Sequence, residues 1–286
     1  MSLEIVRRIA ETRDAVTRFR RAGHTIGLVP TMGALHEGHR RLIETARAEC
    51  GCVVVSIFVN PIQFNRTDDY ERYPRALDAD TRFCEEHGAD LIFVPEISEM
   101  YPRPQRAFVE VERLTEHLCG KFRPGHLRGV TTVVAKLFNI VQPDRAYFGE
   151  KDAQQLAVIR RMAADLNMPV EIIGVPTVRE ANGLALSSRN QHLTPAEREN
   201  AAVISCALRA AEAAVRSGAR TADEVRAAAL SVMARRPEFR VEYFEIVDVE
   251  ELQPVNEITG PVLVATAVWA GTTRLIDNVM VNREGD

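Results

Sequence analysis

The run Val53–Val59 is apolar at every position except Ser56, and it constrains the fold more than any other stretch of the chain. A strand that is apolar on both faces is typical of a parallel sheet covered by helices. Similar runs are expected as strands at 3–6, 24–29, 91–94, 145–148 and 170–175. Helical periodicity separates them at 9–22, 37–49, 78–87, 131–141 and 153–166. This alternation predicts an α/β fold with a doubly wound parallel sheet.

The composition changes after about residue 190, where a second domain is expected. Capping boxes at Thr194–Glu197 and Thr221–Glu224 predict two helices, the first a long one reaching about residue 217 and the second reaching about residue 235. Strands are expected at 241–248, 262–269 and 273–279, which together predict a small α+β domain. The predicted division is 1–177 and 178–286. The proline-containing segment 95–129 is expected to be a mobile crossing and not a packed element.

Composition excludes several classes of protein. The 286 residues carry a formal net charge of −4, which gives no general attraction to nucleic acid. The five cysteines include no Cys-x-x-Cys pair, so reduced thiols are expected. There is neither a signal-peptide pattern nor an apolar run of membrane-spanning length. We therefore expect a cytoplasmic protein with no nucleic-acid or membrane partner.

The segment 30–39 is the first candidate for chemistry, because it opens a helix directly after a strand. Pro30 is expected to end that strand, and Gly33 allows a sharp turn. His36 and His39 share a face of the first helical turn, where N–H groups and the helix dipole favour an anion. Two imidazoles there are suited to donating hydrogen bonds to phosphate. Two ordinary surface histidines remain the alternative.

Three other polar groups are candidates. Asn60 and Gln63 follow the strand 53–59 and offer amide donors and acceptors, although such a loop can also cap its own backbone. The segment Gly149–Asp152 follows another strand, and its Lys151 supplies a point charge suited to phosphate. The segment Ser187-Ser188-Arg189 offers two hydroxyls and a guanidinium, which are suited to a loop that closes over a triphosphate. A polar linker is the alternative.

Four motifs occur in order along the chain: Pro30–His39, Phe58–Phe64, Gly149–Leu156 and Gly183–Asn190. Together with Arg123–Val130 they resemble the motifs of the pantoate–β-alanine ligases, a family within the nucleotidylyltransferase superfamily. The resemblance covers essentially the whole chain. One such motif is weak evidence, whereas four in sequence order are highly specific.

The resemblance implies a Rossmann-like N-terminal domain, a smaller C-terminal α+β lid domain and a homodimer. It also implies a ligase that uses ATP with Mg²⁺ and makes pantothenate in two steps. Pantoate would first attack the α-phosphate of ATP, giving pantoyl adenylate and pyrophosphate. The amine of β-alanine would then displace AMP.

The resemblance also implies roles for individual residues. Those expected to bind ATP are Met32, Gly33, Ala34, Leu35, His36, Glu37, Gly38, His39, Gly149, Glu150, Lys151, Asp152, Val178, Leu186, Ser187, Ser188 and Arg189. The catalytic subset is His36, His39, Lys151, Ser187, Ser188 and Arg189. Substrate binding is expected from Asn60, Gln63, His126 and Gln155. Asp80 matches an acidic position near magnesium, although a charge at a helix N-terminus explains it as well.

Two other functions remain open at this point. One is a different adenylyl transferase of the same superfamily, which would need a cationic cluster for a second phosphate. The other is a non-catalytic nucleotide-binding protein that has kept the fold. The polar amides favour an uncharged hydroxylated acid over the first, and the complete set of motif residues argues against the second.

Overall fold

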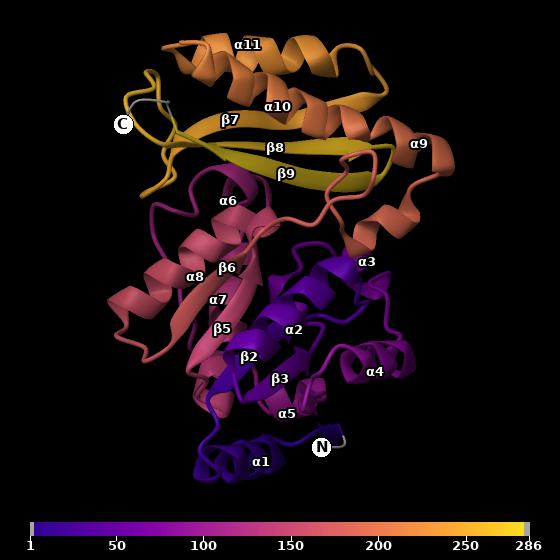
Figure 1. The fold of residues 1–286 in the computed structure, drawn as a ribbon, viewed down its shortest axis with the longest axis vertical. Coiled ribbons are helices and arrows are strands. Elements are labelled where there is room, and N and C mark those ends of the chain that lie inside the picture. Colours follow the sequence, from indigo (N-terminus) through magenta and orange to yellow (C-terminus); the bar gives the residue numbers. More distant parts are fainter. Residues whose placement is uncertain (1–2, 283–286) are drawn as a thin grey trace. The chain divides into compact units, whose positions relative to one another are not determined.

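The computed structural model describes residues 3–282, which form two compact units (Figure 1). The first unit comprises the chain up to Val111 together with Arg123–Glu150 and Gln155–Pro176. The second comprises Glu112–Phe122, Lys151–Gln154 and the chain from Thr177 onward. Two short segments that precede residue 177 in the chain therefore belong to the second unit.

A six-stranded sheet forms the centre of the first unit, with the strand order β1-β4-β3-β2-β5-β6. The strands are β1 (Glu4–Val6), β2 (Ile26–Thr31), β3 (Cys52–Ile57), β4 (Leu91–Phe93), β5 (Arg145–Gly149) and β6 (Glu171–Val175). All neighbouring pairs are parallel. From β2 the chain moves outward to β3 and β4, and it later returns to the other side of β2 as β5. The predicted doubly wound, Rossmann-like sheet is confirmed, with its switch point between β2 and β5.

Successive side chains of each strand enter different cores, because they point to opposite faces of the sheet. Leu28 and Val54 pack in one core with residues of α1, α7 and α8. Val29 and Val55 pack in the other with residues of α2 and α4. These helices are α1 (Ile9–Arg21), α2 (Glu37–Glu49), α4 (Leu77–Glu86), α7 (His126–Val141) and α8 (Ala153–Asp165). Shorter turns of helix are η1 (Pro61–Gln63), α3 (Thr67–Glu71), α5 (Ile97–Met100) and η2 (Glu150–Asp152).

The expectation that Pro30 ends its strand is wrong, because β2 continues to Thr31. Pro30 pairs with Ser56 of β3, whereas β5 pairs only with Gly27 and Leu28. The ladder to β5 has ended before Pro30, so the N–H that proline lacks is not required there.

The second unit contains an antiparallel sheet of β7 (Phe239–Asp248), β8 (Val262–Ala270) and β9 (Thr273–Val281), in that order. Helices α10 (Ala202–Arg216) and α11 (Ala222–Met233) cover one face of it (Figure 1). The remaining elements are α6 (Leu118–Phe122), η3 (Ser188–His192) and α9 (Pro195–Asn200). Both predicted capping boxes form, at Thr194 and at Thr221.

The long helix expected from the Thr194 box is in fact two helices. Helix α9 ends at Asn200 and α10 begins at Ala202, with the fully buried Ala201 between them. The N–H of Ile204 donates to the carbonyl of Ala201, a tighter i to i+3 bond than an α-helix makes. Sequence reasoning missed this break because the residues around it are mostly good helix formers, and helix propensity does not indicate where a helix is interrupted.

The segment 95–129 is packed, so the expectation of an unpacked crossing is wrong. Met100, Leu114 and Leu118 are each at most 3% exposed. The side-chain amide of Gln154 donates to the carbonyls of Leu114 and His117, and its oxygen accepts the N–H of Gly120. The buried side-chain amide of Gln154 thus pairs backbone groups that regular secondary structure would otherwise pair.

No helix among residues 3–282 has the length and apolar character needed to cross a bilayer. All five cysteines are free thiols. Cys50, Cys52, Cys84 and Cys119 are buried, which agrees with the expected structural role for them.

The contact between Gly129 of α7 and η1 leads to a prediction about stability. A Cβ at Gly129 would lie 2.5 Å from the carbonyl oxygen of Ile62 and 2.6 Å from Cα of Gln63. Both are backbone atoms that cannot turn aside, so Gly129→Ala should reduce the free energy of unfolding by about 1–3 kcal/mol. Urea unfolding measures this. Gly260→Ala is the control, because nothing lies within 4 Å of a Cβ there; equal effects of the two changes would refute the prediction.

Candidate active site

The loop after β2 turns through two residues with positive φ, Gly33 at 82° and Ala34 at 52°. The hydroxyl of Thr31 accepts the N–H of Gly33 and donates to the carbonyl of Ser56. This ties the beginning of the loop to β3. An alanine in the left-handed region is uncommon and is kept only when its surroundings fix it.

Asp80, from α4, fixes that loop. Its two carboxylate oxygens accept the N–H groups of Ala34 and Leu35 at 3.0 and 2.8 Å. A Cβ at Gly33 would lie 2.8 Å from one of these oxygens, so the carboxylate requires glycine at that position. Burial raises the pKa of Asp80, and the hydrogen bonds from the two N–H groups act in the opposite direction.

The two histidines cap the start of α2. The N–H of Gly38 donates to Nδ1 of His36 at 3.1 Å, and the N–H of His36 donates to Nδ1 of His39 at 3.2 Å. Because Nδ1 accepts in both rings, each neutral imidazole carries its proton on Nε2. The rings lie 4.2 Å apart between centroids. The helix start therefore places two imidazole rings beside its own N–H groups.

Gly38 has a local role that the sequence does not reveal. A Cβ there would lie 2.8 Å from Cε1 of His36, so the glycine makes room for that ring against the helix. Glu37, by contrast, is exposed and forms an ion pair with Arg40 at 3.2 Å. The structure thus brings His36, Gly38 and His39 together and leaves the Glu37 side chain on the surface.

A cluster of buried amides follows β3. Asn60 donates to Oε1 of Gln63 and to the carbonyl of Gly129, and its own oxygen accepts the hydroxyl of Tyr101 at 2.7 Å. Nε2 of Gln63 lies 3.0 Å from the sulfur of Met32 in the loop after β2. The predicted residues Asn60, Gln63 and Met32 therefore lie together beside the carboxyl ends of β2 and β3.

His126 joins this amide cluster from the start of α7. Nη1 of Arg123 donates to its Nε2 at 3.0 Å, so the neutral ring carries its proton on Nδ1 and donates that proton to the carbonyl of Gln63 at 2.8 Å. His126 thus contacts the main chain of Gln63. Gln155, in the first turn of α8, is half-buried and makes no hydrogen bond with this cluster among the described residues.

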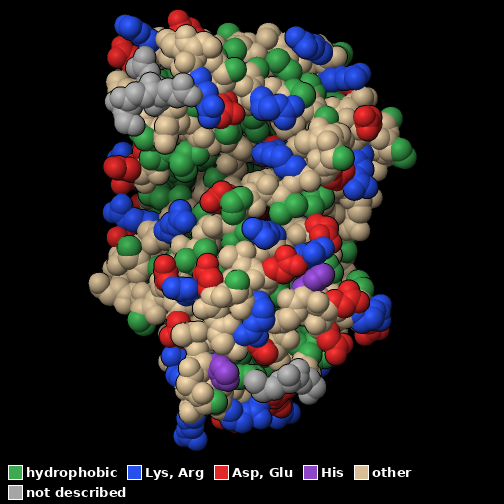
Figure 2. Space-filling view, viewed as in Figure 1, with side chains coloured by type: hydrophobic (Ala, Val, Ile, Leu, Met, Phe, Trp, Pro, Cys, Tyr) green, Lys and Arg blue, Asp and Glu red, His purple; other side chains and the backbone are tan. Residues whose placement is uncertain are grey.

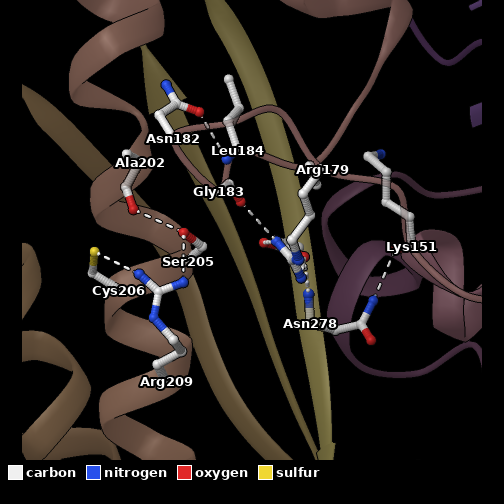
Figure 3. A network of polar contacts seen from close by, with 12 residues as sticks. Lys151, Arg179, Asn182, Gly183, Leu184, Ala202, Ser205, Cys206, Arg209 and Asn278 are labelled. Atoms are coloured by element: carbon white, nitrogen blue, oxygen red, sulfur yellow. Dashed lines mark hydrogen bonds and ion pairs between the residues drawn. The ribbon is translucent and has the colours of Figure 1, made fainter. Parts of the chain in front are cut away.

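The segment after β5 divides between the two units. Gly149 and Glu150 belong to the first unit, whereas Lys151 and Asp152 belong to the second. The ammonium of Lys151 lies 4.0 Å from the carboxylate of Asp152. The carbonyl of Lys151 accepts the side-chain N–H of Asn278 at 2.9 Å (Figure 3).

The predicted second phosphate-binding segment lies at the end of a short hairpin. The N–H of Leu186 donates to the carbonyl of Val178 at 2.9 Å, and Arg179 pairs with Ala185. Ser187 then caps η3, its hydroxyl accepting the N–H of Arg189. Ser188 and Arg189 form the first turn of η3 and are half-buried.

Asp80 is the predicted magnesium residue. Both of its oxygens accept loop N–H groups. The described residues contain no group of three His, Cys, Asp or Glu side chains that could hold a metal ion. Magnesium is usually bound through one or two carboxylates together with waters and substrate phosphates.

Comparison with known proteins decides the family. The family model for pantoate–β-alanine ligase matches residues 4–280. The chain belongs to the pantoate–β-alanine ligase family. A pantothenate synthetase of Moorella thermoacetica is 53% identical, over 98% of this chain and 99% of that protein. A second, from Pelotomaculum thermopropionicum, is also 53% identical, over 96% of this chain and 98% of that protein.

Solved structures of the family have the same fold. The pantothenate synthetase of Thermus thermophilus matches with a TM-score of 0.91 and 47% identity, over 97% of this chain and 99% of that one. A pantoate–β-alanine ligase of Francisella tularensis, complexed with β-γ ATP and β-alanine, matches with a TM-score of 0.80 and 35% identity. That match covers 98% of each chain. The Rossmann-like unit and the smaller α+β unit are thus features of a ligase family.

Several residues that shape the ligase site escaped sequence reasoning. Tyr101 and Gln154 orient predicted residues or segments through buried hydrogen bonds, and Asp277 and Asn278 hold two others. Tyr101, Asp277 and Asn278 carry no motif of their own. Gln154 and Arg123 had a signal, because they lie within the motifs Gly149–Leu156 and Arg123–Val130 that resemble those of the family.

The contacts of Asp80 predict that its loss destabilises the loop. Asp80→Ala would leave the N–H groups of Ala34 and Leu35 without their acceptor, at a cost of about 1–3 kcal/mol in unfolding free energy. Urea unfolding of this variant is compared with that of Asp78→Ala, an exposed carboxylate on the same helix. Unchanged stability of Asp80→Ala, combined with a raised magnesium requirement, would instead support the metal role.

Proposed function

We propose that this chain condenses pantoate with β-alanine at the expense of ATP, through a pantoyl adenylate, to give pantothenate, AMP and pyrophosphate. The helix start that places the imidazoles of His36 and His39 beside its own N–H groups supports the proposal most directly. It supplies fixed donors for negative charge that develops on phosphate. The amide cluster of Asn60 and Gln63 beside it suits the hydroxyl groups of a small hydroxylated acid.

The first step requires a carboxylate to attack the α-phosphate of ATP while pyrophosphate leaves. His36 and His39 would donate to the oxygens of the five-coordinate phosphate, and Lys151 would neutralise phosphate charge. Ser187, Ser188 and Arg189 would bind the departing pyrophosphate from the second unit. Met32–His39, Gly149–Asp152, Val178 and Leu186 complete the proposed ATP contacts. Magnesium would enter bound to the triphosphate of ATP.

In the second step the amine of β-alanine forms a bond to the acyl carbon of the adenylate and loses a proton. The bond between that carbon and the phosphate oxygen breaks, and AMP leaves with the electron pair on this oxygen. Gln63 and Gln155 would contact the pantoyl group and the amine, while Asn60 and His126, whose polar atoms are bonded within the cluster, would hold Gln63 in place. The sequence gives neither Ser187 nor Cys119 a base and orienting partner, so no covalent enzyme intermediate is required. Positioning and electrostatics would supply the rate enhancement.

We further propose that the enzyme acts in the cytoplasm as a homodimer. Five free thiols suit a reducing compartment, and the resemblance to the family implies the dimer. On the face shown in Figure 2, acidic and basic side chains are interspersed without a continuous basic stripe. That distribution suits small-molecule substrates.

The two-step reaction predicts a pattern of product release. With MgATP and pantoate alone, pyrophosphate should be released to about one equivalent per active site, because the adenylate stays bound. Sustained AMP release should require β-alanine as well. Separate assays of pyrophosphate and AMP, with each acid alone and with both, measure this. Tight ATP binding without release in any combination would favour a non-catalytic nucleotide-binding protein.

The role of His39 predicts a specific defect. Loss of one transition-state donor costs about 10²–10³-fold in rate, so His39→Ala should slow pantoate-dependent pyrophosphate release by that factor. Single-turnover pyrophosphate release measures the first step alone. His87→Ala, at the end of α4, serves as the matched control. Near-normal release by His39→Ala would exclude the proposed role.

A further inference from the structure

Two adjacent residues of β9 hold both of the predicted phosphate-binding segments that belong to the second unit. One segment contains Lys151, and the other is the Leu186–Arg189 loop. They lie 35 or more positions apart along the chain, and β9 follows much later, at Thr273–Val281. Figure 3 shows Lys151, Arg179 and Asn278 next to one another at this strand.

Asp277 holds the hairpin that carries Leu186–Arg189. Its two carboxylate oxygens accept the two terminal nitrogens of Arg179 at 2.6 and 3.0 Å. The same guanidinium donates to the carbonyl of Gly183 at the hairpin turn. The Asp277 side chain is only 3% exposed, and a bidentate pair of this kind fixes geometry as well as charge. The hairpin is therefore held to β9 through Arg179, whose guanidinium also binds the hairpin's own turn.

Asn278 holds the other segment. Its side-chain N–H donates to the carbonyl of Lys151 at 2.9 Å. Its main-chain N–H donates to Oδ1 of Asp277 at 2.8 Å, so the carboxylate that accepts Arg179 also accepts the residue that contacts Lys151. A continuous set of hydrogen bonds thus runs from the hairpin through Asp277 and Asn278 to Lys151.

We propose that Asp277 and Asn278 are positioning residues that fix Lys151 and Leu186–Arg189 relative to each other for the triphosphate of ATP. The inference rests on the proposed function. The reacting phosphates must be met by a cation and by hydroxyl donors at a fixed separation, and a misplacement of about 1 Å can cost about 10²-fold in rate. Neither residue needs to contact substrate, because each acts through Arg179 or through the Lys151 main chain.

The test measures whether Asn278 acts through Lys151. Asn278→Ala should raise the KM for ATP and slow pantoate-dependent pyrophosphate release by about ten- to a hundredfold, while the KM for β-alanine stays unchanged. Adding Asn278→Ala to Lys151→Ala should cause little further loss of first-step rate, because substitutions at residues that act as a unit do not have additive effects. Asn200→Ala is the matched control, since Asn200 donates at the surface of the same unit, to Glu238 at 3.3 Å.

Asp277 is tested in the same way through the other segment. Asp277→Asn leaves only one oxygen to accept the two N–H donors of the Arg179 guanidinium, so it should raise the KM for ATP. Combined with Ser188→Ala, it should raise that KM little further. Thermal unfolding separates positioning from folding: the kinetic constants are compared at a temperature at which each variant and the Asn200→Ala control are fully folded. If Asn278→Ala does not fold, Asn278→Ser, which keeps a short donor, carries the same comparison.

Two results would overturn the inference. One is an ATP KM and first-step rate of Asn278→Ala equal to those of the Asn200→Ala control. The other is a Lys151→Ala/Asn278→Ala double variant in which the first-step rate falls by the product of the two single effects. Calorimetric binding of MgATP without any acid distinguishes this failure from failure of the proposed function. Weakened binding by Asn278→Ala would sustain the positioning role even if the wild-type chain released no pyrophosphate with pantoate, and unchanged binding would refute it.

Discussion

The reversal of strand order between β2 and β5 is the constraint on which the first unit depends. The chain leaves β2 toward β3 on one side and leaves β5 toward β6 on the other, so the connections after these two strands diverge. Parallel strands place their carboxyl ends at one edge, and a polar opening forms where connections diverge. The loop after β2, the amides after β3 and the glycine that ends β5 therefore gather at one edge.

Hydrogen bonds from distant parts of the chain give those segments their conformation. Asp80 holds a loop 45 and 46 positions before it, and Asn60 is fixed by Tyr101 and by the carbonyl of Gly129. In the second unit, Asp277 holds Arg179, 98 positions away. Buried polar groups must be paired, and here the pairs also orient side chains that the proposed chemistry requires. Stability and function thus draw on the same contacts.

Sequence reasoning succeeded where the signal is local. The helix 37–49 was predicted with its bounds, the parallel strands to within two or three residues, and both threonine capping boxes at their positions. It failed where tertiary contacts override local pattern. Within segment 95–129, Gln154 satisfies the backbone of Leu114, His117 and Gly120, and the helix after Thr194 breaks at the buried Ala201. Neither contact leaves a periodic trace in the sequence.

By itself the sequence determined the fold class, the family motifs and the kinds of side chain available, because strand alternation, capping residues and motif spacing are local properties. The tertiary structure decided how those side chains are held. The tautomers of His36 and His39 follow from which backbone N–H groups reach their Nδ1 atoms. The contacts of Asp80 with the loop, and of Asp277 and Asn278 with the two predicted phosphate-binding segments, join residues that are far apart in the sequence. Such contacts exist only once the chain has folded, since closing each loop costs entropy that the packed core offsets.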